Sequence, residues 1–246
     1  FYCVRTERDN TEKYIDAIAR GSKGKIVNYQ QVLDSNNCTK VAFMGVLRGT
    51  NIVYNWAKQN KKDFYYIDRP YWGESRGTPY WMRCVKNEHV KTKHENRPDD
   101  RYKKYYKGDQ IKPYHKNGKY VLVVPPSHSM ALHFNSADWL ENTLKILKEN
   151  TDREIIIHNK FSKESLDELL KNAWAFVSLQ SSAGFKAMLN GVPAYFTEKT
   201  LKDINRIEEI ENPKIDYTIF NNLAYGQWTL KEIESGEAWE TISNKN

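Results

Sequence analysis

The fold is decided by the stretch AFVSLQSSAGFKAMLNGVPAYF, which runs from Ala175 to Phe196. Its pattern predicts a buried strand over 175–179, a polar turn over 180–182, a short helix over 183–189 and a second buried strand over 192–196. Gly191 suits the end of the helix, because glycine readily takes the left-handed cap conformation. Pro193 cannot continue a helix, so the chain after it is extended. Strand, helix and strand in this order are typical of an open parallel sheet.

The turn of this stretch carries candidate ligand-binding groups. In open parallel sheets ligands bind outside the carboxyl ends of the strands. Ser181 and Ser182 offer two hydroxyls there, and the helix that begins at Ala183 offers backbone N–H groups that suit a phosphate or diphosphate. The alternative is that one of the serines only caps the helix.

Two other strand ends in the second half are expected beside this turn. A strand over 120–124 leads into Pro125, Pro126 and Ser127, and a strand over 154–157 leads into His158, Asn159 and Lys160. Because adjacent parallel strands end at the same edge of a sheet, Ser127, His158 and Lys160 would join the serines in one crevice. Lys160 could offset the charge of a departing diphosphate. Each of the three also has a purely structural alternative, as a turn, strand-end or surface residue.

The first half of the chain predicts a βαβ unit that could carry a general base. It consists of a strand over 40–46, a glycine turn, a helix over 51–59 and a strand over 63–67. Asp68 follows the last strand and is the leading base candidate; its alternative role is a cap or a salt bridge to Arg69 or Arg83. Arg48, Tyr71, Trp72 and Arg83 are candidate contacts for phosphates or for an acceptor.

A basic, tyrosine-rich segment over 86–119 is the best candidate for binding nucleic acid. Its cations would neutralise phosphates and its aromatic rings would stack on bases. The alternative is a solvated lysine-rich linker. The cations expected to contact DNA are Lys91, Lys93, Arg97, Arg101, Lys103 and Lys104.

Composition and missing motifs exclude several functions. The 246 residues carry a formal net charge of +7, a moderate excess that favours a polyanionic partner only if it is clustered. Three scattered cysteines show no metal spacing and suit a reducing compartment, and no apolar run reaches the length of a membrane span. The sequence lacks an Asp-x-Asp pair after a strand, a Gly-x-Ser-x-Gly elbow and a Walker loop, which disfavours the enzymes that depend on them.

The whole pattern resembles the glycosyltransferases of GT-B architecture. Residues 181–193 (SSAGFKAMLNGVP) look like the small-small-Ala-x-x-Glu-Ala-x-x-x-Gly-x-Pro element of their nucleotide-binding lobe, except that Lys186 stands where many relatives have a glutamate that holds the donor ribose. The segments DRPYWG at 68–73, VVPPS at 123–127 and QWTLKEI at 227–233 look like bacteriophage enzymes that glycosylate 5-hydroxymethylpyrimidines in DNA.

This resemblance implies an α/β fold with two Rossmann-like lobes facing across a cleft. We expect residues 1–118 to form the lobe that binds the acceptor and DNA. Residues 119–246 would bind the nucleotide sugar, with the last helix packing back on the first lobe. Carried over, Ser181, Ser182 and Ala183 hold the diphosphate of a UDP-sugar, Lys160 assists its departure and Asp68 is the base.

The expected activity is inverting, metal-independent transfer from a UDP-sugar to a hydroxymethylated pyrimidine in double-stranded DNA. No tightly bound cofactor is expected. The protein would be a cytoplasmic monomer or small homo-oligomer in an infected bacterium, with no membrane contact. Two alternatives stay open: a glycosyltransferase acting on a surface polysaccharide or small glycan, and a non-catalytic nucleic-acid-binding protein.

Overall fold

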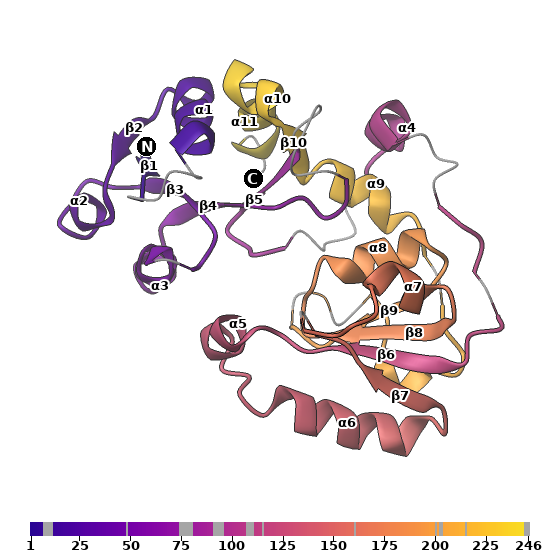
Figure 1. Ribbon diagram of the computed structural model, residues 1–246. Coiled ribbons are helices and arrows are strands. Elements are labelled where there is room, and N and C mark those ends of the chain that lie inside the picture. Colours follow the sequence, from indigo (N-terminus) through magenta and orange to yellow (C-terminus); the bar gives the residue numbers. More distant parts are fainter. Residues whose placement is uncertain are drawn as a thin grey trace. The chain divides into compact units, whose positions relative to one another are not determined.

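The chain forms two compact units, which are described here separately. The structure is a computed structural model that describes residues 1–6, 12–47, 49–73, 81–90, 96–106, 111–114, 116–159, 161–199, 201, 204–214 and 216–243. The first unit comprises Phe1–Lys91 together with Leu223–Asn246, and the second comprises Thr92–Asn222 (Figure 1).

The first unit is built on a six-stranded sheet in the order β10-β5-β4-β3-β1-β2. Neighbours among β2, β1, β3 and β4 run parallel, whereas β5 is antiparallel to β4 and β10 is antiparallel to β5. The strands are β1 (Tyr2–Val4), β2 (Lys25–Val27), β3 (Lys40–Met44), β4 (Asp63–Asp68), β5 (Trp81–Lys86) and β10 (Gln227–Thr229).

The helices of the first unit come from both ends of the chain. They are α1 (Glu12–Ser22), α2 (Tyr29–Leu33), α3 (Thr50–Gln59), α10 (Leu230–Ser235) and α11 (Glu237–Ser243). Thr229 is the kind of residue that caps a helix, and it does so here: its hydroxyl accepts from the Glu232 amide and the Glu232 carboxylate accepts in return from the Thr229 amide. This capping box begins α10 directly after β10.

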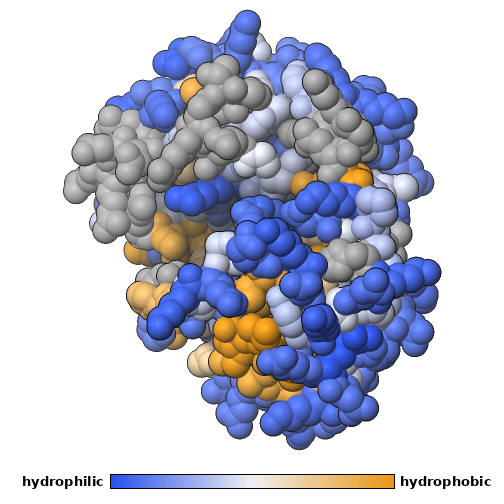
Figure 2. Space-filling model, turned by 45° about the vertical axis from the view of Figure 1, so that its right-hand side comes forward, coloured by the Kyte–Doolittle hydropathy of each residue, from blue (hydrophilic) through white to orange (hydrophobic). Residues whose placement is uncertain are grey.

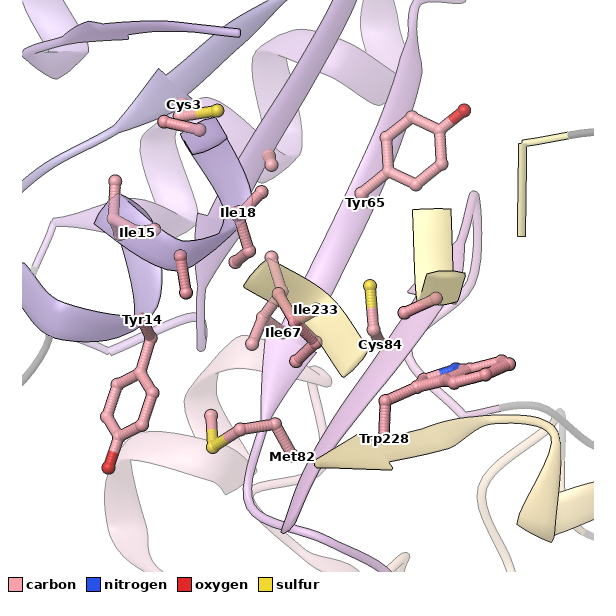
Figure 3. Packing of buried hydrophobic residues seen from close by; sticks show 14 of the residues in the cluster. Cys3, Tyr14, Ile15, Ile18, Tyr65, Ile67, Met82, Cys84, Trp228 and Ile233 are labelled. Carbon is pink, nitrogen blue, oxygen red and sulfur yellow. The ribbon is translucent and has the colours of Figure 1, made fainter. Parts of the chain in front are cut away.

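One core joins α1 to the sheet and to the C-terminal segment (Figure 3). Ile15 and Ile18 of α1 lie in the same buried cluster as Ile67 of β4, Trp228 of β10 and Ile233 of α10. All five side chains are at most 5% exposed, so the cluster is closed to water. The last residues of the chain are therefore part of the hydrophobic core of the first unit.

The second unit is built on a four-stranded parallel sheet in the order β7-β6-β8-β9. Its strands are β6 (Tyr120–Val124), β7 (Glu154–Ile157), β8 (Ala173–Ser178) and β9 (Ala194–Phe196). Every residue of β8 is buried, as the apolar run in the sequence predicts for a central parallel strand. The strands β7 and β8 lie on opposite sides of β6. The order in which successive strands are added to the sheet therefore changes sides at β6.

The remaining helices belong to the second unit, except that α9 runs past its end at residue 222 (Figure 1). They are α4 (Asp100–Tyr106), α5 (His128–His133), α6 (Trp139–Asn150), α7 (Leu166–Leu170), α8 (Ala183–Leu189), η2 (Ile207–Glu209, a 3₁₀ turn) and α9 (Ile219–Ala224). Trp139 of α6 and Ile210 after η2 pack with Val121, Val177 and Tyr195 of the sheet in one cluster.

Three sequence predictions differ from the structure. The sequence pattern over 201–210 predicts a helix, but the described part of this segment forms only the 3₁₀ turn η2. The sequence pattern predicts a helix over 163–171 with Ser162 as its cap. The helix begins instead after Ser165, whose hydroxyl accepts from the Glu168 amide, while the Ser162 hydroxyl accepts from the amide of Asn159. Three strands, β1, β5 and β10, were not predicted at all.

The division of the chain also differs from the expected boundary between 118 and 119. Residues before that boundary pack within the second unit: the Arg97 amide donates to Asn222 Oδ1, the Tyr102 ring lies 5.9 Å from that of Phe220, and the Lys112 amide donates to the Leu189 carbonyl. These contacts place the change of unit near residue 91.

On the face seen in Figure 2, the described residues are mostly hydrophilic, with smaller apolar areas between them. Among the described residues, no helix combines the length and apolar character that a membrane crossing requires.

Candidate functional site

The carboxyl edge of the second unit's sheet brings three sequence-predicted segments next to one another. The strand β6 pairs with β7 up to Val123 and Ile157, and with β8 up to Val124 and Ser178. The residues that follow these strands therefore leave the sheet side by side. The predicted adjacency of the three strand ends is confirmed.

The turn after β8 is held by its own serines. Ser178 Oγ, which is buried, accepts from the Ser181 amide at 3.2 Å, and Ser181 Oγ accepts from the Ala183 amide at 3.3 Å. The amide of Gly184 donates to the Ser181 carbonyl at 2.9 Å. Two amides at the start of α8 are thus used inside the turn, so the helix start offers fewer free N–H groups than the sequence suggested.

The two serines remain accessible. Ser181 is half-buried and Ser182 is exposed, and Ser182 occupies the N-cap position without a side-chain cap bond. The cap alternative therefore applies to Ser181, whose hydroxyl bonds Ala183, and not to Ser182. Neither serine lies in the packed interior.

The helix after the turn is fixed tightly against the next strand. A Cβ added at Gly184 would lie 2.5 Å from the ring of Phe196, and the rings of Phe185 and Phe196 are 5.1 Å apart. Only glycine allows this approach, so Gly184 determines how closely the start of α8 lies against the sheet.

At the other two strand ends, Ser127 and His158 are described and Lys160 lies outside the described residues. Ser127 is exposed, and its Oγ accepts from the Met130 amide as the cap of α5. His158 is held through its amide, which donates to the Val123 carbonyl at 2.9 Å. Its Nδ1 is buried with no hydrogen-bond partner among the described residues.

Sequence reasoning missed two polar residues at this edge, Ser178 and Gln180. Ser178 was treated as part of a buried strand, yet its hydroxyl supports the turn. The Oε1 atom of Gln180 is buried and accepts no hydrogen bond from any described residue. The available signal for Ser178 was a polar residue near the end of an apolar strand, and Gln180 already stood in the predicted polar turn.

Lys186, which stands where many GT-B enzymes have a glutamate, forms an ion pair. Its Nζ lies 2.6 Å from Oδ1 of Asp167 on α7, and both side chains are about half exposed. The lysine therefore ties α8 to α7 in the described structure.

In the first unit, Asp68 forms the salt bridge that was its structural alternative. Its Oδ2 accepts from Arg83 Nη2 at 3.0 Å and from the Tyr66 hydroxyl at 2.6 Å, and its Oδ1 accepts from the Arg69 amide at 2.7 Å. Asp68 and Arg83 are also direct partners in the β4–β5 register. The Asp68 side chain keeps 31% of its surface exposed.

The other candidates near Asp68 are packed side chains. Arg83 is 6% exposed, Tyr71 is 1% exposed and Trp72 is 6% exposed. The guanidinium of Arg83 lies 5.3 Å from the Tyr71 ring centre and 5.5 Å from that of Tyr66. This burial argues against direct contact with phosphates or an acceptor, the role the sequence suggested for all three. Arg48 lies outside the described residues.

Only some of the cations expected to contact DNA are described and exposed enough to reach a phosphate. Lys91 and Lys93 lie outside the described residues. Arg101 is 7% exposed, with its guanidinium 5.0 Å from the Tyr105 ring centre, and Lys103 Nζ is 2.7 Å from Asp99 Oδ2. Lys104 Nζ also lies against the Tyr105 ring, at 4.8 Å. The burial of Arg101 argues against a role in binding phosphates.

The described residues contain no group of three histidine, cysteine, aspartate or glutamate side chains that could hold a metal ion. Cys3, Cys38 and Cys84 are all free and buried. Burial raises the pKa of the Cys84 thiol to about 12, so this thiol stays protonated at neutral pH.

Comparisons with known proteins give distant structural likenesses. No protein-family model and no curated protein matches the sequence. Two solved structures from Thermosulfurimonas dismutans KpsC are similar. The β-Kdo 2,7 transferase has a TM-score of 0.46 and 12% identity, over 100% of this chain and 98% of that one. The β-Kdo 2,4 transferase has a TM-score of 0.49 and 12% identity, over 93% and 91%. Likenesses at this level do not establish a family or an activity.

Proposed function

We propose that this chain is a glycosyltransferase that takes its sugar from a nucleotide-sugar donor bound by the second unit. The observation that carries the proposal is the carboxyl edge of the parallel sheet, where the strands on either side of β6 follow one another in the chain. Parallel α/β sheets bind nucleotides at such a switch point. The accessible hydroxyls of Ser181 and Ser182 lie directly after β8, at that point.

The proposed donor is a UDP-sugar. Ser181 and Ser182 would donate their hydroxyl hydrogens to its diphosphate, with Ser127 and His158 contributing from the neighbouring strand ends. The resemblance of residues 181–193 to the nucleotide-binding element of GT-B enzymes supports this assignment. On this proposal the second unit is the donor lobe and the first is the acceptor lobe.

The proposed reaction is a direct, inverting and metal-independent displacement at the anomeric carbon. The acceptor hydroxyl loses its proton to the Asp68 carboxylate and forms a bond to that carbon. The bond from the carbon to the diphosphate oxygen breaks, and Lys160 offsets the charge left on the diphosphate. The 31% exposure of the Asp68 side chain is compatible with a proton acceptor in contact with substrate.

Calorimetry with UDP tests the donor site. We expect Ser181→Ala and Ser182→Ala each to weaken UDP binding about 10-fold or more, because a hydrogen bond to a charged group contributes about 1.5–3 kcal/mol. Ser243→Ala is the matched control, since its hydroxyl donates to the Trp239 carbonyl within the first unit. Unchanged UDP affinity in both serine variants would exclude the proposed site.

The proposed acceptor is DNA that carries hydroxymethylated pyrimidines. It is supported by the basic segment over 86–119 and by the likeness of three short segments to phage DNA glycosyltransferases. Incubation of hydroxymethylated DNA with UDP-glucose, UDP-arabinose and UDP-GlcNAc, followed by mass measurement, tests it. A folded protein that adds no mass with any of these donors counts against this acceptor.

A second candidate acceptor is a surface polysaccharide or small glycan. The burial of Arg101 and the pairing of Lys103 with Asp99 favour it, because both leave fewer cations for phosphates. A salt titration separates the two, since binding through many phosphates weakens steeply with salt. Salt-sensitive DNA binding together with no UDP binding would instead indicate the non-catalytic nucleic-acid-binding protein.

A further inference from the structure

We infer that Tyr66 and Arg83 are positioning residues, which hold the Asp68 carboxylate in the orientation in which it accepts a proton. This inference rests on the proposed function, in which Asp68 is the base. It assigns to Arg83 a role other than contact with substrate, and it gives Tyr66 a role that its place in an apolar strand did not suggest.

The two donors act on the same carboxylate oxygen. The Tyr66 hydroxyl lies 2.6 Å and Arg83 Nη2 lies 3.0 Å from Oδ2 of Asp68. The other oxygen, Oδ1, receives one hydrogen bond from the described residues, from the amide of Arg69. Because Oδ2 is held from two sides, rotation of the carboxylate is restricted, and Oδ1 keeps capacity to accept a further proton.

Both donors are fixed by their surroundings. Tyr66 is 0% exposed and its ring lies 4.4 Å from that of His89. Burial first, and the nearby Asp68 second, raise the pKa of Tyr66 well above its ordinary value, so the phenol stays protonated and can only donate to the carboxylate. Burial acts most strongly, to lower the pKa of Arg83, but Asp68, Tyr66 and Tyr71 together outweigh it and the pKa is raised, so Arg83 stays cationic.

A residue far along the chain completes the support. Gln227 of β10 is 0% exposed; its Oε1 accepts from the Tyr71 amide at 2.8 Å and its Nε2 donates to the Trp72 carbonyl at 3.3 Å. These bonds fix the segment whose Tyr71 ring lies against the Arg83 guanidinium. The orientation of Asp68 is therefore supported by β4, β5 and β10 together.

The chemical consequence is a base that needs little reorientation when the acceptor arrives. In the transfer step the acceptor O–H bond breaks, its proton goes to Oδ1 of Asp68, the sugar carbon bonds to the acceptor oxygen and the diphosphate leaves with the bonding electron pair. A carboxylate already fixed in the reacting geometry avoids the rate loss of roughly 100-fold that misplacement by about 1 Å can cause.

The test measures kcat and KM for Tyr66→Phe and Arg83→Lys in the full chain. We expect kcat to fall about 10- to 100-fold in each, with the KM for the donor unchanged, because only the transition state uses the oriented base. Two matched controls lack this role: Tyr65→Phe removes a buried hydroxyl on the adjacent residue, and Arg153→Lys alters an arginine paired with Glu211 in the second unit. Both controls are expected to keep the wild-type kcat once folded.

Double variants decide whether the effect passes through Asp68. If Tyr66 acts only by holding Asp68, then Asp68→Asn with Tyr66→Phe is no slower than Asp68→Asn alone. Additive losses, or unchanged kcat in Tyr66→Phe and Arg83→Lys, overturn the positioning role while leaving the proposed transfer intact. Full activity in Asp68→Asn overturns both the base and its positioning, and a wild-type protein with no transfer from any donor overturns the proposed function itself.

Discussion

Single residues in this protein are strongly affected by their partners across the sheet. Asp63 begins β4, and its carboxylate accepts from Asn87 Nδ2 at 2.8 Å and from Lys86 Nζ at 3.2 Å on β5 and the turn after it. Burial acts most strongly, to raise the pKa of Asp63, but these two partners and the charge of Lys40 together outweigh it, and the pKa lies below 3.8. The charged carboxylate is therefore favoured by folding.

This lowered pKa predicts a specific acid sensitivity. The unfolded chain takes up the proton of Asp63 more readily than the folded chain, so this residue stabilises the fold above pH 3.8 and the contribution is lost as the pH falls through the folded pKa. Denaturant unfolding of Asp63→Asn at several pH values should show less loss of unfolding free energy in acid than the wild type. The exposed Asp152, changed to Asn, is the control. An acid dependence that is the same in Asp63→Asn and the wild type would contradict the assignment.

At the scale of elements, the contact between α1 and α10 depends on one glycine. A Cβ added at Gly21 would lie 1.9 Å from the Ile233 carbonyl oxygen and 3.1 Å from the Gly236 amide nitrogen. Both of these atoms belong to backbone, which cannot move aside as a side chain could. Arg20 and Glu234 add an exposed ion pair between the same two helices.

Gly21→Ala therefore reverses the usual effect of this substitution. In an unobstructed helix, replacing glycine by alanine stabilises by about 1 kcal/mol. Here the methyl group forces α10 away from α1, so we expect a loss of unfolding free energy of about 1–3 kcal/mol, typical of overpacking. Denaturant unfolding measures it, with Arg20→Ala as the control for the exposed ion pair, which should cost less than about 1 kcal/mol. A more stable Gly21→Ala protein would show that the helices are not this close.

At the scale of the whole molecule, the two ends of the chain fold together. Trp228 and Ile233 lie in the cluster that Ile15 and Ile18 of α1 also form (Figure 3). The second unit, by contrast, is one continuous segment, Thr92–Asn222. The first unit therefore needs the C-terminal residues for its core, and the second does not.

Deleting residues 227–246 should consequently destabilise one unit selectively. The deletion removes β10, α10 and α11 and exposes the side chains they cover, such as Met82 and Cys84. We expect hydrogen exchange to show loss of protection in β3, β4 and β5, with protection in β6 and β8 retained. Deletion of residues 244–246 alone is the control. Equal loss of protection in both sheets would indicate that the units do not fold independently.

The sequence by itself determined those helices and strands whose apolar pattern, caps and turn residues lie close together along the chain. Helix α8 was predicted over 183–189 and β6 over 120–124, and the structure gives the same bounds. The order of β6, β7 and β8, with an apolar strand before each polar turn, also predicted that Ser127, His158 and Ser181 follow neighbouring strands. These features were accessible because the periodicity of apolar residues, caps and turn residues act over a few positions.

Only the tertiary structure decided which distant segments pair and which polar groups become buried. Strand β5 was missed because its apolar pattern is interrupted by Arg83, whose burial depends on Asp68, Tyr66 and Tyr71 together. The pairing of β10 with β5 places Gln227 opposite Arg83, although the whole second unit separates these two residues in the sequence. A short-range pattern cannot contain such partners, because the free energy of burying a charge depends on side chains that are close in space and far apart in sequence.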